Sequence, residues 1–161
     1  MTKFVPSFSS RKGYTPKQAL DFSSLMEKQA KPVYERMGII FPVITSSTVN
    51  FIAEFKTVSL LEIARGLKIP HQLASQRIKI LLKLDIVSAH KDQQDKRKTN
   101  YKLTHLGLAQ NELFTAYLSS ADKVFNELDA ELGVDLMALL SLVNQCFANK
   151  SLEQRIFSEG D

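Results

Sequence analysis

Signals that start and stop helices lie close together between residues 59 and 84, and they restrict the possible folds. Ser59 and Glu62 have the spacing of a capping box, so a helix is expected to begin there. That helix is expected to end near Gly66. Pro70 then suits the first position of a second helix, expected to run to about Leu84. Two short helices joined by a tight turn predict a helix-turn-helix motif.

The apolar period changes to that of strands directly after this second helix. Residues 86–91 and 99–103 are predicted strands, and the polar run 92–98 separates them. A short extended piece at residues 56–58 precedes the first helix of the motif. The sequence therefore predicts a mainly α fold with a small β-hairpin wing, that is, a winged helix-turn-helix.

The N-terminal part is expected to contain an arm and a long helix. Residues 1–14 show no sustained periodicity and are interpreted as a flexible arm. Apolar side chains then recur at three- and four-residue steps over residues 15–36, which predicts an amphipathic helix. Thr15 is expected to cap it, with Pro16 at its first position and a bend at Pro32. Either Ser46 or Ser47 is expected to cap a shorter helix.

The C-terminal part predicts two more helices, separated at Gly133. The first enters near Thr104 and reaches about residue 130, and the second is apolar nearly all round. Such a helix needs cover on most sides, so we expect a homodimer interface here. The residues assigned to dimerisation are Leu20, Leu128, Leu132, Leu136, Leu139, Leu140, Val143 and Phe147.

The sequence predicts one domain after the N-terminal arm. We expect a single domain over residues 15–161, with the winged helix-turn-helix at about 43–104 and dimerisation helices at about 15–37 and 105–158.

Charge is distributed unevenly along the 161 residues, whose formal net charge is +4. Residues 65–102 hold 10 basic and 3 acidic side chains, a balance of +7, whereas residues 103–161 hold 3 and 9, a balance of −6. A basic segment this short is typical of an element that binds a polyanion.

The predicted second helix of the motif has one polar face. On a 100° wheel its apolar residues share one arc, to which Arg77 also belongs. Glutamine and serine hydrogen-bond base edges in the major groove, and lysine neutralises phosphates. An ordinary solvated helix face is the alternative. The residues assigned to DNA recognition on this helix are His71, Gln72, Ser75, Gln76, Lys79 and Lys83.

The hairpin tip adds a second candidate contact. Arg97 lies between Lys96 and Lys98, and a narrow minor groove attracts arginine by its concentrated negative potential. Asp95 is expected to hold the Arg97 guanidinium by a charge-assisted hydrogen bond. These four residues are assigned to a DNA-binding wing; an ordinary charged turn is the alternative.

Together these residues resemble the multiple antibiotic resistance regulators, the MarR family. The resemblance spans about residues 59–107 and is carried by the helix opening at 59–64, the turn at 67–70, Asp95-x-Arg97, and Leu-Thr-x-x-Gly at 103–107. His71 with Ser75 and Gln76 looks like a subgroup whose recognition helix begins around a histidine. Asp85 stands where the family usually has glycine, and aspartate tolerates the left-handed conformation required there.

The resemblance implies a cytoplasmic transcription regulator. It implies a homodimer that binds a pseudo-palindromic duplex DNA operator, with repression as the commoner outcome in the family. Many members release DNA when a small aromatic or lipophilic effector enters a cleft, for which the candidate residues here are Tyr34, Phe41, Phe51 and Tyr117. Aromatic residues at helical spacing are more often core than cleft. The open alternative is a winged-helix module that binds protein without specific DNA contact.

Other functions have little support in the sequence. There is no paired nucleophile and base, no phosphate-binding glycine loop and no carboxylate pair, so we expect no enzyme activity and no cofactor. His71, His90 and His105 lack the spacing of metal ligands, so no metal site is expected. The single cysteine, Cys146, is interpreted as a buried thiol, in a chain with no disulfide. No stretch has the length and hydropathy of a membrane span or a signal peptide.

Overall fold

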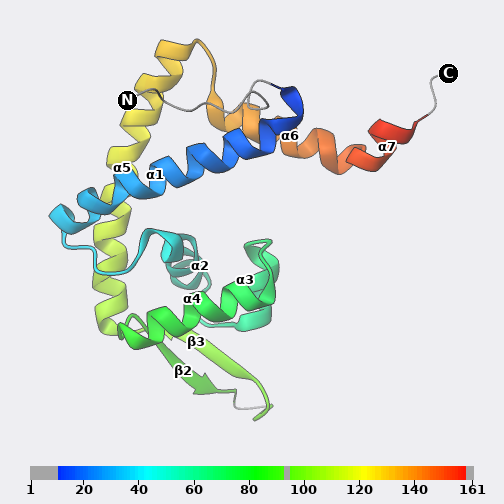
Figure 1. The fold of residues 1–161 in the computed structure, drawn as a ribbon. Helices are drawn as coiled ribbons and strands as arrows, with labels where there is room; N and C mark the ends of the chain where they lie inside the picture. Colours follow the sequence, from blue (N-terminus) through cyan, green and yellow to red (C-terminus); the bar gives the residue numbers. More distant parts are fainter. Residues whose placement is uncertain (1–10, 93–94, 159–161) are drawn as a thin grey trace, which may run out of the picture. The chain divides into compact units, whose positions relative to one another are not determined.

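A computed structural model describes residues 11–92 and 95–158. The fold is mainly helical with one small antiparallel sheet (Figure 1), as the sequence predicted. The chain divides into two compact units, Met1–Tyr117 and Leu118–Asp161. The expectation of one domain after an N-terminal arm stays a prediction, and residues 1–10 of that arm lie outside the described residues.

The first unit contains the predicted winged helix-turn-helix. A 3₁₀ turn at Lys12–Tyr14 leads into the long helix α1, Thr15–Met37, which carries Pro32 in its interior. The remaining elements, in chain order, are a 3₁₀ turn at Val43–Thr45, α2 (Ser46–Phe55), β1 (Val58–Ser59), α3 (Leu60–Gly66), α4 (His71–Lys83), β2 (Val87–Lys91), β3 (Thr99–Leu103) and the start of α5 (His105–Leu132).

Three predicted helix caps are wrong in detail. Thr15 is already inside α1, where its hydroxyl donates to the carbonyl of Lys12 at 2.6 Å. Ser46 is the first residue of α2, and its hydroxyl donates to the carbonyl of Val43 at 2.6 Å. Pro70 precedes α4 as its N-cap with extended backbone. In the first two cases a preceding 3₁₀ turn supplies a carbonyl acceptor, so the hydroxyl turns backward instead of capping forward.

The sheet has the order β1-β3-β2, with both pairs antiparallel. Val87 pairs with Leu103 and Lys91 with Thr99, so β2 and β3 form the predicted hairpin, while Val58 of β1 pairs with Tyr101. β1 lies at 58–59, slightly later than the expected extended piece. This third strand attaches the wing to the segment between α2 and α3.

One hydrophobic core holds the first unit together. It combines apolar side chains from α1, α2, α3, α4, both wing strands and α5, and the aromatic rings of Tyr34, Phe41, Phe114 and Tyr117 pack against one another. Its fully buried large side chains include Phe41, Ile52, Ile63, Leu81 and Ile86.

A buried glutamine ties α5 to the segment after α1. The Gln110 amide oxygen accepts from the backbone N–H of Ile40 at 2.8 Å, and its amide nitrogen donates to the carbonyl of Gly38 at 3.1 Å. Both ends of the buried side chain are therefore used, as a polar group inside a core requires.

The second unit contains the end of α5, α6 (Leu136–Asn149) and α7 (Leu152–Phe157), with the break at Gly133 as predicted. Asp135 caps α6 by accepting from the N–H of Ala138 at 2.7 Å, and Ser151 opens α7 with a capping box. The Arg155 guanidinium donates to the carbonyl of Cys146 at 2.7 Å, closing the end of α6. No single helix in the described ranges is long and apolar enough to cross a membrane. Helices α5 and α6, which are bent at their break, meet the length and composition criteria only when the two are taken together.

Candidate nucleic-acid interface

The turn between α3 and α4 is held by local hydrogen bonds. Ser59 and Glu62 form the predicted capping box. The Ser59 N–H and the Ser59 hydroxyl both donate to the Glu62 carboxylate, each at 2.7 Å. These two bonds lower the pKa of Glu62. After Gly66 the chain turns through Lys68, whose φ is 53°, and the Ile69 N–H bonds back to Ala64 at 3.0 Å. The two helices of the motif are therefore joined by a turn with few free backbone groups.

Helix α4 has one buried face and one exposed polar face. Ala74, Ile78 and Leu81 are buried in the core of the first unit. Within the described residues, the polar face makes no hydrogen bond or ion pair to the rest of the chain, so its donors and cations are available to a partner. Its exposed members are His71, Gln72, Gln76, Lys79 and Lys83, with Ser75 half-buried beside them.

The wing tip is shaped by two aspartates. One carboxylate oxygen of Asp92 accepts from the N–H of Asp95 at 2.9 Å, and the other accepts from the side chain of Asn100 at 2.8 Å. The Asp95 carboxylate accepts from the backbone N–H of Arg97 at 3.0 Å, instead of from the guanidinium as expected. Lys96, Arg97 and Lys98 are exposed, so Asp95 orders the backbone and leaves the arginine side chain extended into solvent. Gln93 and Gln94, in the predicted polar run, lie outside the described residues.

The wing is anchored where α4 ends and α5 begins. Asp85 has a φ of 56°, the left-handed conformation expected of it. The Thr104 hydroxyl donates to the Asp85 carbonyl at 2.5 Å and accepts from the Gly107 N–H at 2.9 Å. A Cβ added at Gly107 would lie 2.0 Å from the carbonyl oxygen of Ile86. Leu-Thr-x-x-Gly is thus the joint that connects α4, the wing and α5.

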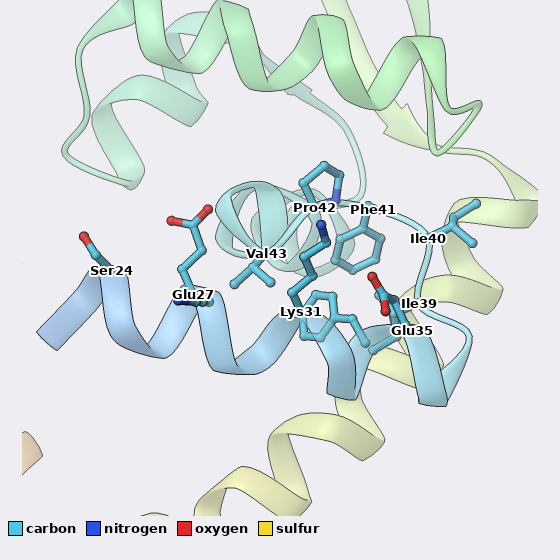
Figure 2. A pocket seen from close by; sticks show the side chains of 11 residues that line it. Ser24, Glu27, Lys31, Glu35, Ile39, Ile40, Phe41, Pro42 and Val43 are labelled. Carbon is cyan, nitrogen blue, oxygen red and sulfur yellow. The ribbon is translucent and has the colours of Figure 1, made fainter. Parts of the chain in front are cut away.

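A separate cavity of about 570 Å³ lies along α1 in the first unit. Figure 2 shows Glu27, Lys31 and Glu35 along one side of α1, facing the segment that carries Phe41 and Val43. Of the four predicted cleft aromatics, Tyr34 and Phe41 line this cavity.

The other two predicted cleft aromatics do not line that cavity. Phe51 is half-buried against Phe55 and Gly66, and Tyr117 stacks on Phe114. Burial raises the pKa values of Tyr34 and Tyr117, which therefore stay neutral as packed rings. The spacing of these four aromatic residues in the sequence did not distinguish those that line the cavity from those that only pack in the core.

The residues assigned to dimerisation are mostly exposed in the single chain. In α6 no residue is buried; Leu139, Val143 and Phe147 are between 43% and 48% exposed. Leu20, Leu132 and Leu140 are also exposed, and Leu128 and Leu136 are half-buried. Cys146 is exposed as well, contrary to the expectation of a buried thiol, because nothing in the single chain covers that side of α6.

No cluster of potential metal ligands stands out. Among the residues of 11–92 and 95–158, no three His, Cys, Asp or Glu side chains are grouped to hold a metal ion. His71 and His90 lie on α4 and β2, and His105 begins α5. The Ser88 hydroxyl and the His90 ring lie 2.9 Å apart on β2, which gives His90 a protein partner.

Comparison with known proteins finds the fold in solved structures. No family model matches the sequence, and no curated protein matches it. A MarR protein from Peptoclostridium difficile is 16% identical with a TM-score of 0.67, over 92% of this chain and 94% of that one. The PcaV transcriptional regulator from Streptomyces coelicolor, solved with its natural ligand, is 14% identical with a TM-score of 0.66, over 91% and 97%.

A DNA complex has the same fold. A point mutant of S. aureus MepR bound to an oligodeoxyribonucleotide is 20% identical with a TM-score of 0.52, over 80% of this chain and 98% of that one. The structural neighbours are transcription regulators rather than enzymes. The winged helix-turn-helix with its flanking N- and C-terminal helices is therefore the fold of the MarR-family regulators.

Proposed function

We propose that this chain is a sequence-specific DNA-binding transcription regulator that acts as a homodimer, with repression as its effect. The observation that carries the proposal is the outer face of α4, where exposed polar and basic side chains have no partner within the described residues. The major groove is about 12 Å wide and accepts an α-helix. The MepR complex with an oligodeoxyribonucleotide supports DNA as the partner of this fold.

Each group on the surface has a proposed role. Gln72 and Gln76 read base edges, since a glutamine amide forms a paired hydrogen bond with adenine. Lys79 and Lys83 neutralise backbone phosphates along the groove. Arg97 enters the adjacent minor groove, while Asp95 holds the tip backbone in the conformation that presents it.

Homodimerisation is proposed from the apolar surface of the second unit. Helix α6 has no buried residue and several large apolar side chains, so a second copy that covers this surface would stabilise it. Two copies present two α4 helices, which predicts an operator of two inverted half-sites.

The test of this function is selection of bound sequences from random duplex DNA by the purified protein. We expect an enriched inverted repeat with half-sites about one helical turn apart, that is, about 10 base pairs. A variant with both Gln72→Ala and Gln76→Ala should retain duplex binding and lose the enrichment. Selection without any enriched sequence would remove sequence-specific recognition from the proposal.

Salt dependence separates DNA binding from a winged-helix module that binds protein. Phosphate contacts release counterions, so the logarithm of the binding constant should fall steeply with the logarithm of salt concentration, by about 0.9 per phosphate neutralised. Absence of duplex binding at low salt would favour the protein-binding alternative.

We further propose that the cavity along α1 binds a small amphiphilic anion that weakens DNA binding. Its volume is within the usual range for ligand sites, and it combines the Tyr34 and Phe41 rings with two lysines, Lys28 and Lys31, beside two carboxylates, Glu27 and Glu35. The lysines are the groups proposed to pair with the anion. The neighbour PcaV was solved with a natural ligand, which supports ligand control in this fold.

Sodium salicylate is a suitable probe of that cavity. Millimolar salicylate should raise the melting temperature, because a ligand that binds only the folded state stabilises it. Lys31→Met should reduce that rise, whereas Lys123→Met, far along α5, should preserve it. An equal rise in both variants would place the binding elsewhere.

A further inference from the structure

Arg77 of α4 reaches α2 instead of joining the polar face of its own helix. Its guanidinium donates to the exposed hydroxyl of Ser47, in the first turn of α2, at 3.2 Å. Sequence spacing placed Arg77 on the apolar arc, where a side chain packs against a neighbouring helix. The contact therefore puts a cation at the junction of α2 and α4.

This cation is incompletely paired. Its Nε atom is buried and has no hydrogen-bond partner in the described part of the chain. No carboxylate of the described residues forms an ion pair with Arg77, so the charge of its guanidinium is not neutralised by the chain. Burial lowers the pKa of its guanidinium, although arginine stays charged at neutral pH. A partly desolvated charge without a counter-ion is costly, and binding an anion offsets that cost.

The surroundings favour a phosphate as that anion. Arginine presents a planar fork of donors that matches phosphate oxygens, and the Ser47 hydroxyl adds a further donor beside it. Arg77 lies on another side of α4 from Gln76 and Lys79, at the edge next to α2. A duplex whose major groove holds α4 carries backbone phosphates on both sides of that helix, so a phosphate can meet this edge while the exposed face reads the bases.

We propose that Arg77 and Ser47 together bind one backbone phosphate of duplex DNA at the junction of α2 and α4. This inference rests on the proposed function and adds a contact to it that the sequence did not reveal. A phosphate held from two helices limits how α4 rotates and shifts in the groove, so the contact positions the base-reading glutamines without reading sequence itself.

The experiment measures the affinity of full-length variants for a selected duplex and for a scrambled duplex at several salt concentrations. Arg77→Gln should lower the magnitude of the salt slope by about 1, with the same fold loss on both duplexes. Arg77→Lys should keep the slope because it keeps the charge. Lys123→Gln, which removes the same charge from α5, should leave slope and affinity at parental values.

A second pair of variants tests the same contact without relying on correct folding of the Arg77→Gln variant. Ser47→Asp places a carboxylate beside the Arg77 guanidinium. This variant should weaken duplex binding and lower the magnitude of the salt slope, while its melting temperature should stay the same or rise. Asn50→Asp adds the same charge to an exposed site on α2 and should have a clearly smaller effect.

The outcomes distinguish the two claims. If the affinity of the parent for duplex falls steeply with salt concentration and Arg77→Gln leaves that slope unchanged, Arg77 is only a packing residue and this inference is wrong. Equal losses in Ser47→Asp and Asn50→Asp would reduce the effect to general repulsion and also overturn it. If the parent binds no duplex, the proposed function fails, and this contact fails with it.

Discussion

At the scale of single residues, the joint between the wing and α5 depends on two backbones that nearly touch. A side chain at Gly107 would collide with the carbonyl of Ile86, and that carbonyl also accepts from the N–H of Thr104 at 3.0 Å. The obstacle is backbone in a hydrogen-bonded turn, so it cannot move aside as a flexible side chain would. The φ of Gly107 is not in the left-handed region, so backbone conformation does not require a glycine here. The glycine is required because there is no space for a side chain.

Gly107→Ala is therefore expected to lower the free energy of unfolding by about 3 kcal/mol, at the upper end of overpacking costs. Urea denaturation followed by circular dichroism measures the change. Gly13→Ala is the matched control, because a Cβ there meets nothing within 4 Å, and it should stay within about 0.5 kcal/mol of the parent. Equal stability of both variants would contradict the assigned role of Gly107.

Arg97 is the residue-scale test of the wing. Because its side chain is exposed and Asp95 bonds only its backbone N–H, Arg97→Ala should leave the loop folded. We expect it to weaken operator binding by about 1 to 3 kcal/mol, measured by fluorescence anisotropy. Sedimentation should give the same oligomeric state as the parent. Unchanged affinity would remove the wing arginine from the mechanism.

At the scale of elements, the short helix α3 depends on its N-terminal cap. The capping box bonds both Ser59 and Glu62, and it lowers the pKa of Glu62. A carboxylate with a lowered pKa in the folded state stabilises the fold above its unfolded pKa, and this contribution disappears as pH falls through the folded pKa.

Ser59→Ala should accordingly cost about 1 kcal/mol of unfolding free energy at pH 7, and less as the pH falls through the lowered pKa that Glu62 has in the folded state. Chemical denaturation over a series of pH values from 7 downward measures the change. Glu62→Gln serves as the control, since a glutamine keeps a hydrogen-bonding side chain but does not titrate. A cost for Ser59→Ala that is independent of pH would contradict the contribution of the carboxylate.

At the scale of the whole molecule, the apolar surface of α6 is the basis of the proposed homodimer. Leu139 and Val143 are each 43% exposed in the single chain, in a helix whose residues are all at least partly exposed. A second copy that covers this face removes apolar area from water, at about 25 cal/mol per Å². In the proposed homodimer, association would therefore give this helix most of its stability.

The double substitution Leu139→Asp and Val143→Asp should convert the dimer to a monomer in sedimentation equilibrium, because two carboxylates at an apolar interface lose hydration without gaining partners. Gln145→Glu adds a negative charge on the opposite side of the same helix and should remain dimeric. DNA binding should weaken in the monomer, since one half-site is lost. A parent protein that is already monomeric at micromolar concentration would refute this arrangement.

Local chemistry in the sequence was sufficient for most of the order of elements, although the prediction of two C-terminal helices missed the short helix α7 and its capping box at Ser151. The capping box at Ser59, the left-handed Asp85, the break at Gly133 and the period change after α4 each depend on neighbours a few residues away, and each was predicted correctly. The caps of α1 and α2 were predicted wrongly because a preceding 3₁₀ turn competed for the same hydroxyls.

Only the tertiary structure decided which partner each polar side chain meets. Arg77 bonds to Ser47 of α2, Gln110 bonds to the backbone after α1, and Asp95 bonds to a backbone amide instead of a guanidinium. Tyr34 is buried in the core and also lines the cavity, whereas Tyr117 packs against that core without lining the cavity, although both are aromatic residues at helical spacing. Helix periodicity specifies the face on which a side chain lies, whereas its partner depends on which distant segment the core brings against that face.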